Sequence, residues 1–512
     1  VPGWCRGRVG LDVAGSGGWW ATRARPLAQA TGAVLDREAL AAHLAVPLVE
    51  ELRSPRSLWR GVCQAPPGHT LYLTHQRAAT TAPAPLSGLE PAEIAQRLRT
   101  ALTDAVALRT PDSAHVSADL SGGMDSTTIT LLAARHTPVF ATTYTAPDLG
   151  NHTDVHHART AAATSRAITH YLARGDHTTW PYTDLHQQIP TDAPALDLRA
   201  WARHRAYLTP AAEHGSTVHL TGNGGDNVLS TGPAHLADLL AHGHHRRAWT
   251  QTLAHARLWR IPVHRLARAV LRLARTRYPD ALTNLADHLQ HRTRPPRLER
   301  TLTWAAPTAL AAWLTPAARQ SLAHQTHQAA AAADQEHQDL LPGQWADHRG
   351  LRYYAAGHTT FCDLAHHDIG LDINAPFLDN TVVRATLAAP SWTRADAYRF
   401  KPRLREAMHG LLPPQVGERD SKDSFTTHAY QGLRRNAPAI EDLLATSQLA
   451  EAGLVDTAPA LAALERAADG RPAPLGALAH LITTEMWARS LHEAPSWWAD
   501  TPHPATTVKG HQ

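Results

Sequence analysis

The sequence has few cysteines and no long apolar run, and both absences narrow the class of protein. Its 512 residues include only Cys5, Cys63 and Cys362, which are scattered and form no Cys-x-x-Cys pair. A disulfide framework is therefore excluded, and a reduced, cytoplasmic location is expected. No run of about eighteen apolar residues occurs, and the segment Val1–Trp4 lacks the basic and apolar regions of a signal peptide. We therefore expect no membrane span.

Lysine is almost absent as well. Only Lys401, Lys422 and Lys509 are lysines, and the other 46 of the 49 basic residues are arginines. Together with 35 histidines, this bias indicates a compositional drift rather than a function. A formal net charge of +4 over the whole chain does not by itself indicate a basic surface for nucleic acid, so no nucleic-acid partner is expected. Each remaining lysine becomes a candidate for a specific role.

Composition divides the chain into three parts. Residues 1–77 carry short apolar stretches such as Leu71–Leu73, broken by turn-forming residues, which is typical of a small strand-rich unit. Residues 78–89 are small and rich in proline, which interrupts strand ladders, so they predict a linker. Residues 90–512 are long enough to bury a large core and form the second domain.

The second domain shows an α/β pattern. After Pro91, apolar residues recur at every fourth position, which predicts an amphipathic helix. Beyond about residue 235 the sequence is mostly helical in character. Before that point, strand-like runs alternate with helical stretches, and this alternation favours a parallel sheet covered by helices. The expected strands lie at residues 115–120, 138–144, 169–172 and 217–221.

A glycine-rich segment, Leu120–Ser126, follows the first of these strands and precedes a helical run. A glycine pair between a strand and a helix lets the backbone approach a ligand, while the first amides of the helix point at it, so the segment predicts a phosphate site. Asp125 fits an anion site only if a cation such as Mg²⁺ bridges it to the phosphate oxygens. The alternative is a plain strand-to-helix turn with a capping side chain.

The string Ser-Gly-Gly-x-Asp-Ser resembles the pyrophosphate loop of ATP-pyrophosphatase enzymes, and a second segment, Leu220–Asn227, resembles a motif of the asparagine synthetase family. The resemblance implies an adenine nucleotide alpha-hydrolase-like synthetase domain that uses ATP and Mg²⁺. It also implies that Asp125 and Asp226 are both metal ligands and catalytic residues. The implied ATP-binding residues are Leu120, Ser121, Gly122, Gly123, Asp125, Ser126, Thr143, Thr221 and Gly222.

Three later segments extend the resemblance. Gly370–Asp379 is similar to the family's Pro-Phe-Leu-Asp segment, and Lys401–Arg405 is similar to its Lys-x-x-Leu-Arg helix. Arg419–Phe425 corresponds to the segment that carries the family's active-site lysine, so the resemblance implies that Lys422 is catalytic. An adenylate intermediate needs a cation near the pyrophosphate or the developing oxyanion, which a lysine ammonium supplies. The alternative is a solvated surface lysine.

The amino-terminal unit is similar to the end of the family's glutaminase-like domain, which is of the Ntn type. In glutamine-dependent members an amino-terminal cysteine hydrolyses glutamine. This sequence begins with Val1, and Cys5 would become terminal only after the loss of four residues. We therefore expect a truncated glutaminase-like domain without that activity, or a chain in which Val1 is internal.

Members without a glutaminase include β-lactam synthetases and lasso-peptide macrolactam synthetases (lasso cyclases), which use an amine of the same substrate. Asn223 and Asn227 depart from the residues of the other branches. The segments Arg23–Leu27 and Ala311–Arg319 resemble lasso cyclases. The resemblance implies a ligase that adenylates a carboxylate of a peptide precursor, releases AMP and pyrophosphate, and closes a macrolactam ring, with a leader peptidase and a leader-binding protein as partners. Asparagine synthesis, another small-molecule amidation and a non-catalytic peptide-binding scaffold remain the alternatives.

One basic segment has no place in that reaction. Arg265, Arg268, Arg272 and Arg275 recur at three and four residues and predict one basic face of a helix. This face would either dock an acidic leader or partner or simply be solvated. The adjacent histidine pairs lack the spacing of a helical zinc site, so no further metal is expected.

Overall fold

The structure is a computed structural model of the chain. It describes residues 8–10, 19–53, 56–65, 70–73, 78–81, 91–111, 115–146, 152–187, 189–336, 341–397, 399–418 and 425–493.

A five-stranded parallel sheet forms the centre of the second domain, as the sequence predicted. The strand order is β10-β9-β6-β7-β8. The fifth strand lies in the segment that resembled the Pro-Phe-Leu-Asp motif and was not expected there. The strands are β6 (Val116–Asp119), β7 (Val139–Thr145), β8 (Ile168–Arg174), β9 (Val218–Leu220) and β10 (Asp372–Asn374).

The chain changes direction within this sheet between β6 and β9. From β6 the strands proceed through β7 to β8 on one side, and the chain then returns to place β9 on the other side of β6. The connections on either side of such a switch point lead away from each other, so a crevice opens at the carboxyl ends of the strands. The loops after β6 and β9, which carry the two glycine motifs, meet at this crevice.

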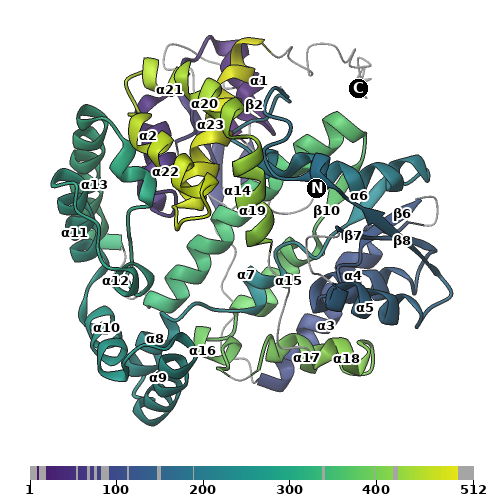
Figure 1. Cartoon of the computed structure of the whole chain (residues 1–512). Coiled ribbons are helices and arrows are strands. Elements are labelled where there is room, and N and C mark those ends of the chain that lie inside the picture. Colours follow the sequence, from purple (N-terminus) through teal and green to yellow (C-terminus); the bar gives the residue numbers. More distant parts are fainter. Residues whose placement is uncertain are drawn as a thin grey trace, which may run out of the picture.

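Helices from both sides of the sheet cover its strands β6–β8. Helices α4 and α5 lie against one face and α6 against the other (Figure 1). The apolar residues that predicted the first helix, Ile94, Leu98, Leu102 and Val106, are all buried, and this helix packs on α4. The helices are α3 (Pro91–Ala107), α4 (Met124–Ala133), α5 (His152–Ala162) and α6 (Trp201–Glu213).

The amino-terminal unit contains helices as well as strands, so its description as strand-rich is incomplete. Strands β2, β1 and β3 form an antiparallel sheet, and two helices fall between β2 and β3. Alanine and leucine, which have high helix propensity, dominate these two helices. The elements are β1 (Arg8–Gly10), β2 (Trp19–Ala21), α1 (Ala24–Thr31), α2 (Arg37–Ala45), η1 (Glu50–Leu52) and β3 (Val62–Gln64).

The linker expected at residues 78–89 is wrong for its first four residues. Ala78–Thr81 is strand β5, which pairs antiparallel with β4 (Thr70–Leu73). These residues precede the first proline of the segment, Pro83, so all their amides remain available for the ladder. Residues 82–90 lie outside the described part of the chain.

The amino-terminal unit shares its core with the second domain. Arg23 donates to both carboxylate oxygens of Asp363, with its closest contact at 2.6 Å. The amides of Ala24 and Arg25 both donate to Asp192. Buried residues of α1 and α2 belong to the same apolar cluster as those of the carboxyl-terminal helices. The described part of residues 1–77 therefore packs in one core with the second domain.

The remaining chain is helical, as expected, and none of its described helices has the length and apolarity to cross a membrane. The α-helices are α7 (Gly225–Leu229), α8 (His235–Ala241), α9 (His245–Trp259), α10 (Val263–Arg275), α11 (Tyr278–Gln290), α12 (Arg297–Thr301), α13 (Pro316–Glu336), α14 (Pro342–Ile369), α15 (Asn380–Leu387), α16 (Ser391–Arg394), α17 (Pro402–Ala407), α18 (Pro414–Gly417), α19 (Thr426–Arg435), α20 (Ala437–Ala445), α21 (Gln448–Glu451), α22 (Ala458–Ala468) and α23 (Leu475–Glu493). The 3-10 helices are η3 (His177–Thr179), η4 (Leu196–Ala200), η5 (Ala309–Trp313) and η6 (Pro376–Leu378).

Candidate active site

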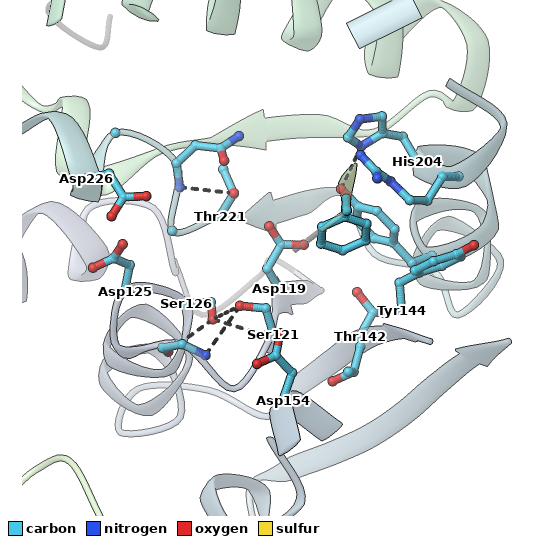
Figure 2. Close-up of a pocket in the computed structure, with 18 of the residues that line it drawn as sticks. Asp119, Ser121, Asp125, Ser126, Thr142, Tyr144, Asp154, His204, Thr221 and Asp226 are labelled. Atoms are coloured by element: carbon cyan, nitrogen blue, oxygen red, sulfur yellow. Dashed lines mark hydrogen bonds between the residues drawn. The ribbon is translucent and has the colours of Figure 1, made fainter. Parts of the chain in front are cut away.

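A cavity of about 330 Å³ lies at the carboxyl ends of β6, β7 and β9 (Figure 2). We call it the nucleotide pocket. Most of the residues that the sequence placed at an ATP site line it, although they come from three strand ends. They are Ser121, Gly123, Asp125, Ser126, Thr143, Thr221, Gly222 and Asp226.

The loop after β6 is held in a shape that only glycine permits. Gly122 has a φ of +79°, and a Cβ built on it would lie 2.1 Å from the carbonyl oxygen of Asp154. The amide of Ser121 donates to Ser126 Oγ over 3.1 Å, and the two serine hydroxyls share a hydrogen bond of 2.9 Å. The loop therefore turns tightly into α4, whose amino terminus faces the cavity and suits an anion.

Two predicted ATP residues shape the loop without lining the cavity. Leu120 is fully buried, its amide donates to the carbonyl of Thr142 over 2.8 Å, and its own carbonyl accepts from the Thr143 hydroxyl. Gly122 faces the backbone of α5. Both residues fix the path of the loop, and the structure gives neither of them a surface in the pocket.

The loop after β9 packs directly on the first loop. A Cβ at Gly222 would lie 2.6 Å from the amide nitrogen of Ser126, and a Cβ at Gly225 would lie 2.4 Å from the carboxylate carbon of Asp125. These contacts require glycine at both positions. They bring the second motif against the first, across about one hundred residues of sequence, as the resemblance implied.

Asp125 and Asp226 point toward one another (Figure 2), and both form ion pairs with the ammonium of Lys401. The contact from Lys401 Nζ to Asp226 Oδ1 is 2.6 Å, and the same Nζ donates to Asp125 Oδ2. The Lys401 side chain is only 2% exposed, and its backbone φ is +48°, so the residue is held in an uncommon conformation immediately before α17. One buried cation therefore joins the two carboxylates.

Lys422, the lysine chosen from the sequence, lies in the segment 419–424 outside the described residues. The site therefore does not test its role. Phe425, three residues further on, lines the nucleotide pocket, and the guanidinium of Arg203 lies 4.6 Å from the centre of its ring. The rarity of lysine in this chain, which directed attention to Lys422, applied equally to Lys401.

A family model for asparagine synthase matches residues 97–489 of this chain. The chain belongs to the asparagine synthase family. The match covers the parallel sheet, both glycine motifs and Lys401. Family membership implies an ATP-dependent ligase that forms an amide bond and releases AMP and pyrophosphate. No curated protein matches the chain.

Enzymes of the asparagine synthase family use ATP, usually with Mg²⁺, and the residues of this pocket fit that ion. Mg²⁺ is bound by oxygen ligands, often one or two carboxylates together with substrate phosphates. Asp125 and Asp226 already converge on one cation, the Lys401 ammonium. The absence of a Cβ at Gly225 leaves the Asp125 carboxylate the room to take this position.

Several pocket residues carry no sequence signal. Arg203 and Tyr207 come from α6, and Tyr354 comes from α14. Burial raises the pKa of both tyrosines above the usual value and lowers that of the guanidinium of Arg203. These residues lie on helices, and no sequence motif or glycine-rich turn marks their positions. Only the tertiary structure shows that they reach the site.

A second cavity, of about 300 Å³, adjoins the nucleotide pocket, and we call it the chamber. Four residues line both spaces: His204, Tyr207, Asn223 and Tyr354. Segments from the whole chain form its walls: His43 and Arg53 from the amino-terminal unit, Asp197 and Arg199 from η4, and His480 from α23. The amino-terminal unit thus contributes directly to a space beside the nucleotide site.

His358 stands where the two cavities meet. Its Nδ1 lies 3.5 Å from the side-chain nitrogen of Asn223, which lines both spaces, and its Nε2 lies 3.5 Å from Cys362 Sγ. Burial lowers the pKa of His358 to about 4, so its imidazole is neutral at pH 7. An imidazole with so low a pKa is a weak base and can accept a proton only from an acidic donor.

Proposed function

We propose that this chain is a lasso-peptide macrolactam synthetase, which adenylates a side-chain carboxylate of a processed precursor peptide and joins it to an amine of the same peptide. The observation that carries the proposal is the chamber. It shares Asn223 and Tyr354 with the nucleotide pocket and is walled by the amino-terminal unit and the last described helix. Because a volume of about 300 Å³ is that of a small-molecule site, we propose that the chamber takes the reacting residues of the peptide and not the whole peptide.

The composition of the chamber supports a peptide. Its walls combine rings, such as Tyr353 and Phe361, with the guanidinium groups of Arg53 and Arg199. Aromatic and cationic groups bind peptide side chains and carboxylates by stacking and ion pairing. The amino-terminal unit contributes His43 and Arg53 to this wall, and Cys63 does not line it. We propose that this unit serves peptide binding in place of glutamine hydrolysis.

In the first step, a carboxylate oxygen attacks the α-phosphorus of ATP. A P–O bond to the carboxylate forms, the bond to the bridging oxygen breaks, and pyrophosphate leaves. The first amides of α4 hold phosphate oxygens, and the Lys401 ammonium offsets the negative charge of the leaving group. Asp125 and Asp226 would hold Mg²⁺, which supplies further neutralisation of the pyrophosphate charge when bound.

In the second step, the amine attacks the carbonyl carbon of the acyl-adenylate, the amide C–N bond forms, and AMP leaves. The attacking amine must lose a proton. His358 lies at the junction where the amine would arrive, and we propose that it accepts this proton once the nitrogen has bonded to the carbonyl carbon and has become more acidic. Most of the rate would come from holding amine and adenylate together in the chamber.

The proposal places the enzyme in the cytoplasm, after a leader peptidase and a leader-binding protein have prepared the peptide. These partners follow from the resemblance of Arg23–Leu27 and Ala311–Arg319 to lasso cyclases. In the structure both segments pack in the shared core: Arg25 donates to the carbonyl of Ser490 over 2.8 Å, and Trp313 is buried.

The test measures pyrophosphate release from Mg²⁺ and ATP by the purified full chain, with an Asp125→Ala variant as the blank. A leader-processed candidate peptide is compared with aspartate plus ammonia. Turnover with the peptide alone, with a product lighter by one water in mass spectrometry, supports the proposal. Turnover with aspartate alone would assign asparagine synthesis instead. If neither substrate leads to pyrophosphate release, a non-catalytic scaffold would be the better explanation.

A further inference from the structure

The positive charge of this chain is concentrated in one segment. Residues 257–300 hold eleven of the 49 basic residues and only three of the 45 acidic residues. This leaves 38 basic and 42 acidic residues elsewhere, so the rest of the chain has a net charge of −4 although the whole chain carries +4. A compositional drift toward arginine would be spread along the sequence. The concentration therefore points to a local role.

The fold gathers these arginines along one groove. A cavity of about 840 Å³ lies between the end of α9, helix α10 and helix α12. We call it the arginine groove. It is on the opposite side of the molecule from strands β6–β8 in Figure 1, and none of its residues lines the nucleotide pocket or the chamber. The arginines that line it are Arg260, Arg265, Arg268, Arg272 and Arg297.

Helix α10 is fixed so that its basic face stays outside. Leu266, Val270 and Leu273 on its other face are buried in the large apolar cluster. All five groove arginines are exposed. Within the described residues only Arg272 has an acidic partner, Glu299 at 3.0 Å, and both of those side chains are more than 40% exposed. An exposed pair of this kind is weak and can open for a competing carboxylate.

The groove also has apolar surface between its charges. Trp259, 37% exposed, and Leu298 and Pro262 lie among the arginines. A second cavity of about 260 Å³ shares Arg272 and Glu299 with the groove and extends it toward α11. Alternating guanidinium groups and apolar contacts suit a chain that alternates carboxylates with apolar side chains.

We propose that the arginine groove binds an acidic peptide segment. Helix α10 has 13 residues and is therefore about 20 Å long, a distance that about six residues of an extended peptide cover. A long nucleic acid fits less well, because so short a basic patch would neutralise only a few of its phosphates. The groove takes no part in the proposed reaction, so the two proposals can fail separately.

The experiment uses the full chain and a fluorescein-labelled peptide of about eight residues that alternates glutamate and leucine. Fluorescence anisotropy at low ionic strength should show saturable binding that weakens as salt is added. A double charge reversal, Arg265→Glu with Arg268→Glu, should weaken binding at least about tenfold. Arg265→Lys with Arg268→Lys retains charge and should bind more tightly than the reversal. ATP binding by these variants, followed separately, should not change.

The matched control reverses two exposed arginines at the other side of the molecule, Arg135→Glu with Arg166→Glu, and should bind the peptide like the parent chain. Equal binding by the parent and the Arg265/Arg268 reversal would overturn the proposal, as would the absence of saturable binding to the parent. Two further probes complete the test: single-stranded DNA of similar charge and vesicles of anionic lipid. Tighter binding of either would assign the groove to a nucleic acid or to a lipid surface instead.

Discussion

The nucleotide pocket and the chamber share a wall, yet they are built in different ways. The pocket arises from two short motifs at strand ends, and its backbone is locked by close approaches at Gly222 and Gly225. The chamber arises from side chains of distant segments: His43 and His480, 437 positions apart, lie with ring centres separated by 5.8 Å. The nucleotide pocket therefore has a local origin, whereas the chamber depends on the assembly of distant segments of the chain.

This difference separates two kinds of defect. Under the proposed function, a change in the pocket should remove adenylation, because the charges that would hold pyrophosphate are few and close together. A change in the chamber should leave adenylation and disturb the transfer that follows. Pyrophosphate release and amide formation report these two steps separately.

The largest effect is expected from Asp125→Asn. The substitution keeps the size of the side chain but removes one of two carboxylates that pair with Lys401. Pyrophosphate release should fall by about a thousandfold, in line with the loss of a main electrostatic group in an enclosed site. An Asp104→Asn variant, which changes an exposed carboxylate on α3, is the control. Retention of more than a tenth of the parent rate would contradict the assignment.

Lys401→Met tests the cation between the carboxylates. The ammonium is 2% exposed and contacts both Asp125 and Asp226, so its loss should lower pyrophosphate release by a hundredfold or somewhat more. Because the carboxylates lose a competing cation, Mg²⁺ alone should bind more tightly to the variant, which calorimetry without nucleotide can measure. Unchanged Mg²⁺ affinity together with unchanged turnover would show that Lys401 is only structural.

Gly225→Ala tests the packing of the two loops. The added Cβ would lie 2.4 Å from the Asp125 carboxylate carbon, so the carboxylate must shift, and a displacement of about 1 Å at such a site costs about a hundredfold in rate. Gly232→Ala is the matched control, since a Cβ there meets nothing within 4 Å. Pyrophosphate release measures both variants, and equal rates would mean that the loops separate freely.

The sequence predicted the pocket because its determinants are local. Asp125 and Asp226 each sit in a contiguous motif after a strand, and both meet where the motifs placed them. Lys401 was quoted only as the start of a helix, because its partner Asp125 is 276 positions away and no spacing rule connects them. The linker prediction failed at Ala78–Thr81 for a related reason, since pairing with β4 outweighs a small-residue composition.

The residues that line the chamber could not be predicted from the sequence, and the reason is physical. Its residues lie on helices such as α14 and α23, where the sequence periodicity reports burial and not the ligand that a side chain faces. Asn223 was noted for its departure from other branches, but its neighbour His358 carried no signal. Buried histidines in a chain with 35 histidines could not be separated from the compositional background.

His358→Gln addresses the transfer step. Loss of a proton acceptor should lower amide formation by at least about tenfold, while pyrophosphate release persists because the adenylate is lost to water. The measured ratio of pyrophosphate to cyclised peptide should therefore rise. His348→Gln is the control, because His348 is also on α14 with a pKa lowered to about 4 by burial but does not line either cavity. A parallel loss of both products would place His358 in the adenylation step.

The smallest expected effect is the response of the free energy of unfolding to pH. We expect this response to come from the chamber more than from the nucleotide pocket. Burial lowers the pKa of His358 and His480, both in the chamber, to about 4. The unfolded chain binds protons below about pH 6.5, whereas these folded imidazoles stay neutral. The contribution of these two histidines to the free energy of unfolding is therefore complete above pH 6.5. It is lost as the pH falls toward 4, by at most about 1.4 kcal/mol per pH unit for each histidine.

Urea unfolding at about pH 7 and about pH 5 should show this loss, and a His358→Gln/His480→Gln variant should lose less stability than the parent. An equal loss in both chains would place the acid sensitivity outside the chamber, and its walls would then be no more sensitive to acid than the nucleotide pocket.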